Sequence, residues 1–155
     1  MSLTQRASLA RMLNGFPEPL TPLPEAVSQT FEWGDLVYMN AGFLTICGAD
    51  PATIVGIAKE NGHNAAAGAY NDDVLLITAD TLIKMHVHHT TPATAVIEDA
   101  DLFKDYGIAV SGHIWYVDKT DTSATRVRII EFIDPVGTLN GLVAVQFLAA
   151  NRKLA

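Results

Sequence analysis

Residues 129–149 read IIEFIDPVGTLNGLVAVQFLA, two short apolar runs joined by a segment rich in turn-forming residues. In the second run, smaller or polar residues alternate with Val143, Val145 and Phe147. Successive side chains of a β-strand point to opposite faces, so this alternation predicts a strand with one apolar face. The same pattern, a short apolar run followed by turn residues, continues back through most of the chain.

Turn-forming residues divide the chain from Phe31 onward, where ten of its eleven glycines lie. The eight apolar runs between the turns have the length of strands and span 36–39, 43–47, 54–58, 74–78, 82–88, 108–117, 126–133 and 142–148. Two connections, NAG (40–42) and DKTDTSAT (118–125), are expected hairpins. The sequence therefore predicts an all-β fold, a compact antiparallel β-barrel or sandwich of about eight short strands.

Two segments carry helix signals. SLTQRASLARML (2–13) places apolar residues near helical spacing after Ser2, a residue type that caps helices, although a helix this short needs a surface to pack on. EDADLFKDYG (98–107) has acidic residues suited to a helix N-terminus and a glycine that could end the helix. We expect one short helix within the β domain, at 98–107.

Residues 1–30, here called the arm, differ in composition from the rest of the chain. Four prolines lie in PEPLTPLP (17–24), where a fixed φ and missing N–H groups disfavour helices and sheet interiors. This segment should be extended. The arm also carries two arginines against two glutamates, whereas residues 31–150 are strongly acidic. We divide the chain into an N-terminal arm over 1–30 and a β-barrel domain over 31–155.

Leu20, Leu23 and Val27 are the candidate interface residues of the arm. An extended segment that cannot bury its own apolar side chains is suited to docking on another subunit. The alternative is that the arm wraps its own barrel or is disordered. The sequence leaves both interpretations open.

Composition excludes several classes of protein. The chain has 155 residues, 49% hydrophobic and 17% charged, which suits one domain with a sizeable core. A net charge of -7 makes nucleic acid and anionic membranes poor partners. No run approaches the roughly 20 apolar residues of a membrane span. The single cysteine, Cys47, excludes an intramolecular disulfide and favours synthesis in a reducing compartment.

HVHH (86–89) is the densest cluster of potential metal ligands in the sequence. In a strand His86 and His88 share a face, so a two-imidazole site is geometrically feasible, but it needs a third ligand. The cupin pattern fails here, because Asp80 stands where its first glycine belongs and Glu98 lies too far beyond His88. We therefore expect no metal and no other cofactor, and His86 and His88 remain weak candidates.

Other catalytic motifs are incomplete. AVSGH (109–113) lacks both outer glycines of the G-x-S-x-G nucleophile elbow. The carboxylates over 98–105 do not form a calcium loop, because Phe103 occupies a ligand position. No glycine-rich phosphate loop lies between a strand and a helix. We expect a protein that is not an enzyme.

Four features of the chain resemble tailed-bacteriophage head decoration proteins, also called capsid cement proteins. They are WGDLV (33–37), the hairpin over 40–42, IVGIA (54–58) and the closing run 129–149. The resemblance spans about residues 31–150 and is a pattern of β runs and glycines. It implies a compact β-barrel that sits as a homotrimer on the outer surface of the expanded capsid, often with an N-terminal arm that reaches a neighbour.

The resemblance implies a structural role in the virion, after synthesis in the host cytoplasm, with the major capsid protein as partner. A protein that binds only the expanded shell stabilises that state, and many copies together resist internal pressure. Two alternatives stay open. One is a small metal-dependent, cupin-like β-barrel enzyme that uses His86 and His88, and the other is a phage tail or fibre component.

Overall fold

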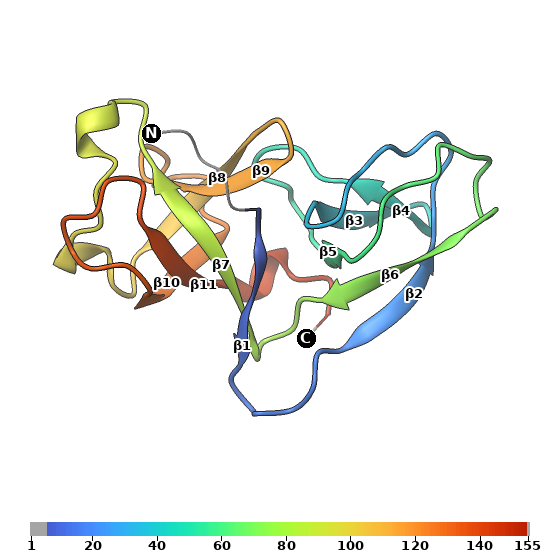
Figure 1. Ribbon diagram of the computed structural model, residues 1–155, viewed down its shortest axis with the longest axis horizontal. Coiled ribbons are helices and arrows are strands. Elements are labelled where there is room, and N and C mark those ends of the chain that lie inside the picture. The colour runs from blue at the N-terminus through green and yellow to red at the C-terminus, as the bar shows by residue number, and fades with distance from the viewer. Residues whose placement is uncertain (1–5, 155) are drawn as a thin grey trace.

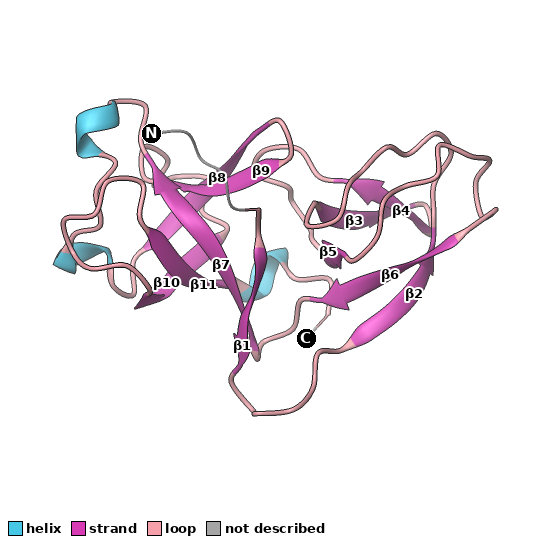
Figure 2. Ribbon diagram, in the orientation of Figure 1, coloured by secondary structure: helices cyan, strands magenta, loops and turns pink. Residues whose placement is uncertain are grey.

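Two β-sheets make up the computed structural model, which describes residues 6–154 (Figure 1). Its eleven strands are β1 (Ser8–Met12), β2 (Leu20–Pro24), β3 (Leu36–Asn40), β4 (Phe43–Ile46), β5 (Gly56–Ala58), β6 (Asn71–Leu76), β7 (Thr81–His88), β8 (Asp105–Ser111), β9 (Ile114–Asp118), β10 (Val127–Phe132) and β11 (Leu142–Phe147). Three short 3₁₀ turns accompany them (Figure 2): η1 (Pro92–Thr94), η2 (Asp99–Asp101) and η3 (Ala149–Asn151). The predicted all-β class is confirmed.

The first sheet closes into a five-stranded barrel in the order β7-β11-β10-β8-β9. Parallel pairing of β9 with residues 86–88 of β7 closes the ring, and every other pair in the barrel is antiparallel. Residues 81–84 of β7 pair along the same edge with β1. The long strand β7 is therefore both a strand of the barrel and the strand to which β1 pairs.

The second sheet is antiparallel, in the order β2-β6-β5-β3-β4. The predicted hairpin over 40–42 is confirmed, because β3 pairs with β4 from Asn40 opposite Phe43. Ala41 and Gly42 both have positive φ, 50° and 88°, as a tight two-residue hairpin turn requires.

One apolar core joins the two sheets. Val143, Val145 and Phe147 are buried as their alternation predicts, and they belong to the same cluster as Leu36 and Leu75 of the second sheet. A second cluster, centred on Phe31, Val37, Leu44 and Val74, covers the other face of the second sheet. The second sheet is therefore covered on both faces, and the two sheets cannot be separated without opening the larger cluster.

The expected helix over 98–107 is wrong. Only the η2 turn forms there, and Asp105 already begins β8 because Arg128 and Val127 of β10 pair with Asp105 and Tyr106. No helix among residues 6–154 is long and apolar enough to cross a membrane.

The apolar run 108–117 is two strands, not one. Gly112, with φ of 62°, turns the chain between β8 and β9, which pair as a hairpin. The expected hairpin over 118–125 is therefore wrong, because β10 pairs with β8 and not with β9.

The helix allowed at 2–13 is also wrong over its described part, while residues 2–5 lie outside the described chain. Ser8–Met12 is strand β1, which pairs Leu9 with Ile83 of β7. Ala7 is buried in the main core. Pairing with β7 outweighs the weak helix propensity of so short a segment.

The proline-rich segment is extended, as predicted. It contains β2, an edge strand that pairs along its whole length with β6 of the same chain. The backbone N–H of Glu25 donates to Tyr70 O and therefore faces β6. Because backbone nitrogens alternate between the two edges of a strand, those of Pro24 and Pro22 face the outer edge, where no neighbouring strand needs an N–H donor. The described arm residues thus supply one strand to each sheet.

Gly56 provides a test of the packing between β5 and β6. A Cβ at this position would lie 2.2 Å from Leu75 O and 2.4 Å from Val74 Cγ1. We expect Gly56→Ala to lower the free energy of unfolding, measured with urea, by about 2 kcal/mol or more. The control is Gly48→Ala, where a Cβ meets nothing within 4 Å and the change should stay within about 0.5 kcal/mol. Equal small effects would contradict the register of β5 and β6.

Candidate functional site

The three interface residues predicted on the arm do not share one environment. Leu20 and Val27 are exposed, at 48% and 59%, whereas Leu23 packs half-buried against the second apolar cluster. Leu20 follows the β1–β2 loop, which carries two more exposed apolar side chains, Leu13 and Phe16, the latter 70% exposed. This loop projects at the bottom of Figure 1. We call Leu13, Phe16 and Leu20 the apolar loop.

A second group of exposed apolar side chains lies on two other loops. It contains Leu102 and Phe103 after η2, and Ile133, Val136 and Leu139 between β10 and β11. Figure 1 places both loops at the left end of the molecule, away from the projecting β1–β2 loop. We call this group the left-end group.

His86 and His88 lie on β7, as predicted, with half-buried side chains. The Nδ1–H of His86 donates to Asn140 O at 2.6 Å. The ring of His88 packs against Tyr116 with 4.5 Å between centroids. Within residues 6–154, the pair gains no third side chain that would complete a metal site.

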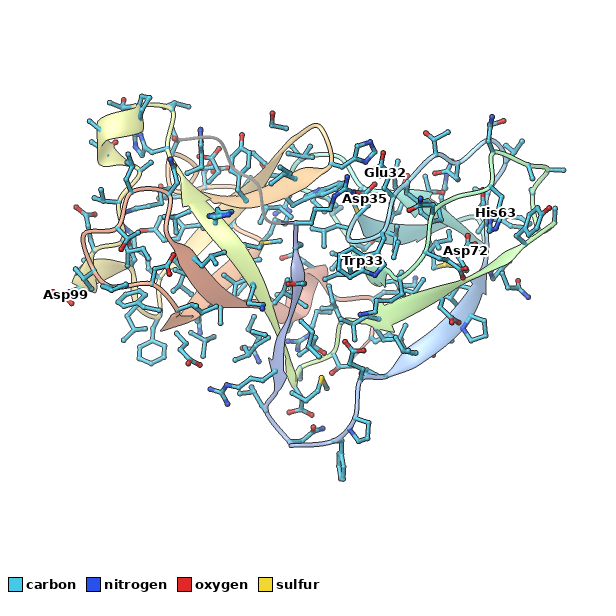
Figure 3. All side chains as sticks on the ribbon, in the orientation of Figure 1. Glu32, Trp33, Asp35, His63, Asp72 and Asp99 are labelled. Carbon is cyan, nitrogen blue, oxygen red and sulfur yellow. The ribbon has the colours of Figure 1, made fainter. Side chains whose placement is uncertain are left out.

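A polar cluster forms elsewhere, from Glu25, His63 and Asp72. Glu25 directly follows β2, Asp72 lies in β6, and His63 lies on the β5–β6 loop. Pairing of β2 with β6 and folding of the loop over this pair bring the three together, and Figure 3 shows His63 beside Asp72 on the right-hand side. Glu25 is 1% and Asp72 0% exposed, while the side chain of His63 is 35% exposed.

The hydrogen bonds of the cluster are uneven. The carboxylate of Glu25 accepts from the backbone N–H of His63, at 2.9 and 3.0 Å, and from its Nδ1–H at 2.9 Å. Asp72 Oδ1 lies 3.2 Å from the same Nδ1, but that hydrogen is directed to Glu25. Neither oxygen of Asp72 therefore has a hydrogen-bond partner among the described residues.

The electrostatics of the cluster follow from this burial. Desolvation and the neighbouring Glu25 together raise the pKa of Asp72 to about 6, and the nearby His63 lowers it by less than they raise it. The pKa of His63 is raised because Glu25 accepts its hydrogen bond. Such an arrangement holds either protons or a cation between its two carboxylates.

No site was predicted from the sequence at Glu25, His63 or Asp72. Asp72 could have been noticed in the sequence, because it lies two residues before the apolar Val74. Alternate residues of a strand point to the same face, so this spacing places a carboxylate on the buried face of β6. The two neighbours of Asp72 come from distant segments that only the pairing of β2 with β6 brings together.

A cavity of about 290 Å³ lies beside β3 and β4 and is lined by Tyr38, Ile46, Gly48, Pro51, Ala52 and Thr53. This lining offers hydroxyl groups and no charged side chain. No carboxylate, imidazole or thiol is among the lining side chains.

The chain was compared with protein-family models, with curated proteins and with solved structures, and none of them matches. Function is therefore inferred from the apolar loop, the left-end group and the polar cluster.

The raised pKa of Asp72 predicts a dependence of stability on pH. Its carboxyl has a pKa of about 6 in the folded chain and about 3.9 in the unfolded chain. The folded chain therefore binds this proton more tightly, and wild-type stability falls as pH rises from about 4 through 6. We expect Asp72→Asn, whose amide can donate to Glu25, to be more stable than wild type by about 2 kcal/mol at pH 8 in buffer without divalent cations.

The difference between Asp72→Asn and wild type should shrink towards pH 4, as measured by urea denaturation. Asp73→Asn is the matched control, because Asp73 is exposed on the opposite face of β6. Its stability should follow wild type at both pH values. An Asp72→Asn variant that is less stable than wild type at pH 8 would contradict the raised pKa of Asp72 in the folded chain.

Proposed function

We propose that this protein decorates the head of a tailed bacteriophage, binding the outer surface of the expanded capsid and stabilising it against internal pressure. The observation that carries the proposal is the apolar loop, presented by an all-β body. The resemblance of residues 31–150 to capsid cement proteins supports the same function. In this proposal the major capsid protein is the partner of the apolar loop.

The apolar loop is held in place before it meets a partner. Leu13 N–H donates to Asp80 O at 2.7 Å, and Asn14 Nδ2 donates to the Asp80 carboxylate at 3.1 Å. Phe16 N–H donates to Asn14 Oδ1 at 3.0 Å. Because the backbone around Phe16 is already ordered, docking its ring costs less conformational entropy than docking a free chain segment would. Large exposed apolar side chains on such a loop are typical binding anchors.

A homotrimer would use the left-end group for contacts between copies. Threefold contacts are heterologous, so each copy needs two different surfaces that meet in a closed ring. Each contact should bury about 800 Å² per partner to be stable. Assigning the left-end group to this role leaves the apolar loop free for the capsid.

The test is co-sedimentation with heads of the phage that encodes the chain, prepared without it. We expect saturable binding to expanded heads and none to unexpanded proheads. Phe16→Asp should weaken binding to expanded heads by about tenfold or more, because a carboxylate replaces an apolar anchor. Unchanged far-UV circular dichroism would show that the variant is folded.

Val136→Asp is the matched control, an equally drastic change at an exposed apolar residue of the left-end group. Val136→Asp should weaken the trimer, as measured by sedimentation velocity. The variant protein should still bind heads through the apolar loop. Binding to tails and not to heads would overturn the decoration role in favour of a tail component. Normal head binding by Phe16→Asp would overturn the assignment of the apolar loop.

A further inference from the structure

We propose that Glu25, His63 and Asp72 form a binding site for a divalent transition-metal ion, with zinc as the expected occupant. One ligand atom from each residue lies within 4.8 Å of the others. The site is separate from the apolar loop and from the left-end group, and its existence does not depend on the decoration role.

The spacing of the donor atoms suits a zinc ion. His63 Nδ1 lies 2.9 Å from Glu25 Oε2 and 3.2 Å from Asp72 Oδ1. Tetrahedral zinc with bonds of about 2.0–2.1 Å separates its ligand atoms by about 3.3 Å. Shifts of a few tenths of an ångström would therefore place the donors around an ion, once the Nδ1 proton has left.

Asp72 differs from the other buried aspartates in its hydrogen bonds. Asp35 accepts from Glu32 N–H at 2.7 Å and His113 Nδ1 at 2.6 Å. Asp101 accepts from Lys119 Nζ at 2.7 Å and from Tyr106 Oη at 2.5 Å. Asp72 is also fully buried but has no hydrogen-bond partner among the described residues, although its Oδ1 lies 3.2 Å from His63 Nδ1. Buried carboxylates are normally hydrogen-bonded or bound to a metal, so the position of Asp72 suits a cation ligand.

The charge balance leads to the same conclusion. Two buried carboxylates face one imidazole, so with both ionised even a protonated His63 leaves the cluster negative. A divalent ion with neutral His63 brings the sum to zero. The ion would replace the proton on Nδ1, which now points to Glu25.

Surrounding groups hold the three ligands in position. The backbone N–H of His63 fixes the Glu25 carboxylate. The ring of Tyr70 stacks on the ring of His63, with 3.9 Å between centroids and 5° between planes. Such supporting contacts orient metal ligands and tune their affinity. The partly exposed His63 leaves an approach from solvent and room for water as a fourth ligand.

The donor set selects among divalent ions. Mg²⁺ and Ca²⁺ prefer oxygen ligands and more of them than two carboxylates supply. An imidazole together with carboxylates suits zinc and similar transition metals. A bound ion would join the arm, through Glu25, to the β5–β6 loop and to β6. It would therefore stabilise the folded chain by binding it and not the unfolded chain.

The test measures zinc directly on the full chain. Protein stripped with a chelator is dialysed against zinc at a fixed free concentration, and bound metal is counted by mass spectrometry. We expect one zinc per chain and a higher melting temperature. His63→Gln and Asp72→Asn should each weaken binding by at least about tenfold. His63 is partly exposed, so His63→Gln should fold, which circular dichroism would verify.

His88→Gln is the matched control, because it removes a histidine from the strand pair that lacks a third ligand. It should retain zinc like wild type. Absence of stoichiometric zinc, equal retention by His63→Gln, or binding of Ca²⁺ in preference to zinc would each overturn the proposal. Co-sedimentation with expanded heads, repeated with His63→Gln, separates this result from the decoration role, since the apolar loop is unchanged in that variant.

Discussion

Strand β7 is the constraint on which both the barrel and the N-terminal attachment depend. One edge pairs with β11, and the other is divided between β1 at residues 81–84 and β9 at residues 86–88. Inward residues such as Ile83, Met85 and Val87 are fully buried, so β7 cannot slip by one residue without turning them outward. Its length of eight residues is what allows three strands to share it.

Electrostatic contacts add a second link between the sheets. Asp35, just before β3, accepts hydrogen bonds from His113 in the β8–β9 turn and from Glu32 N–H, and Arg6 before β1 lies 3.4 Å from it. Burial raises the pKa of Asp35, and the hydrogen bonds from Glu32 and His113 offset that rise only in part. Asp72 contrasts with Asp35, because both are fully buried aspartates but Asp72 accepts no hydrogen bond from the described residues.

Local pattern predicted the elements whose environment is itself local. The alternation in β11 and the turn over 40–42 each determine a strand or hairpin from neighbouring residues alone. β1 could not be recognised, because its strand form depends on β7, some seventy residues away in the chain. The β8–β9 turn was missed although Ser111, Gly112 and His113 interrupt the run, because the interruption is short and apolar residues flank it on both sides. The polar cluster was missed for the same reason as β1, since the β2–β6 pairing and the β5–β6 loop join three distant segments.

The arm's second strand connects the two proposed sites. β2 starts at Leu20, at the end of the apolar loop, and finishes next to Glu25 of the polar cluster. Because β2 is an edge strand, only β6 holds it along its length within the described chain, together with an isolated bridge from Glu25 to Leu44. Prolines on the outer edge prevent another strand from pairing there. Contacts of Glu25 with His63 and Asp72 therefore hold the C-terminal end of β2 in place. Leu20, at the other end of this short strand, belongs to the apolar loop. A stabilising ion at Glu25 would limit fraying at that end of β2, while the hydrogen bonds of Leu13 and Asn14 to Asp80 hold the apolar loop at the other end.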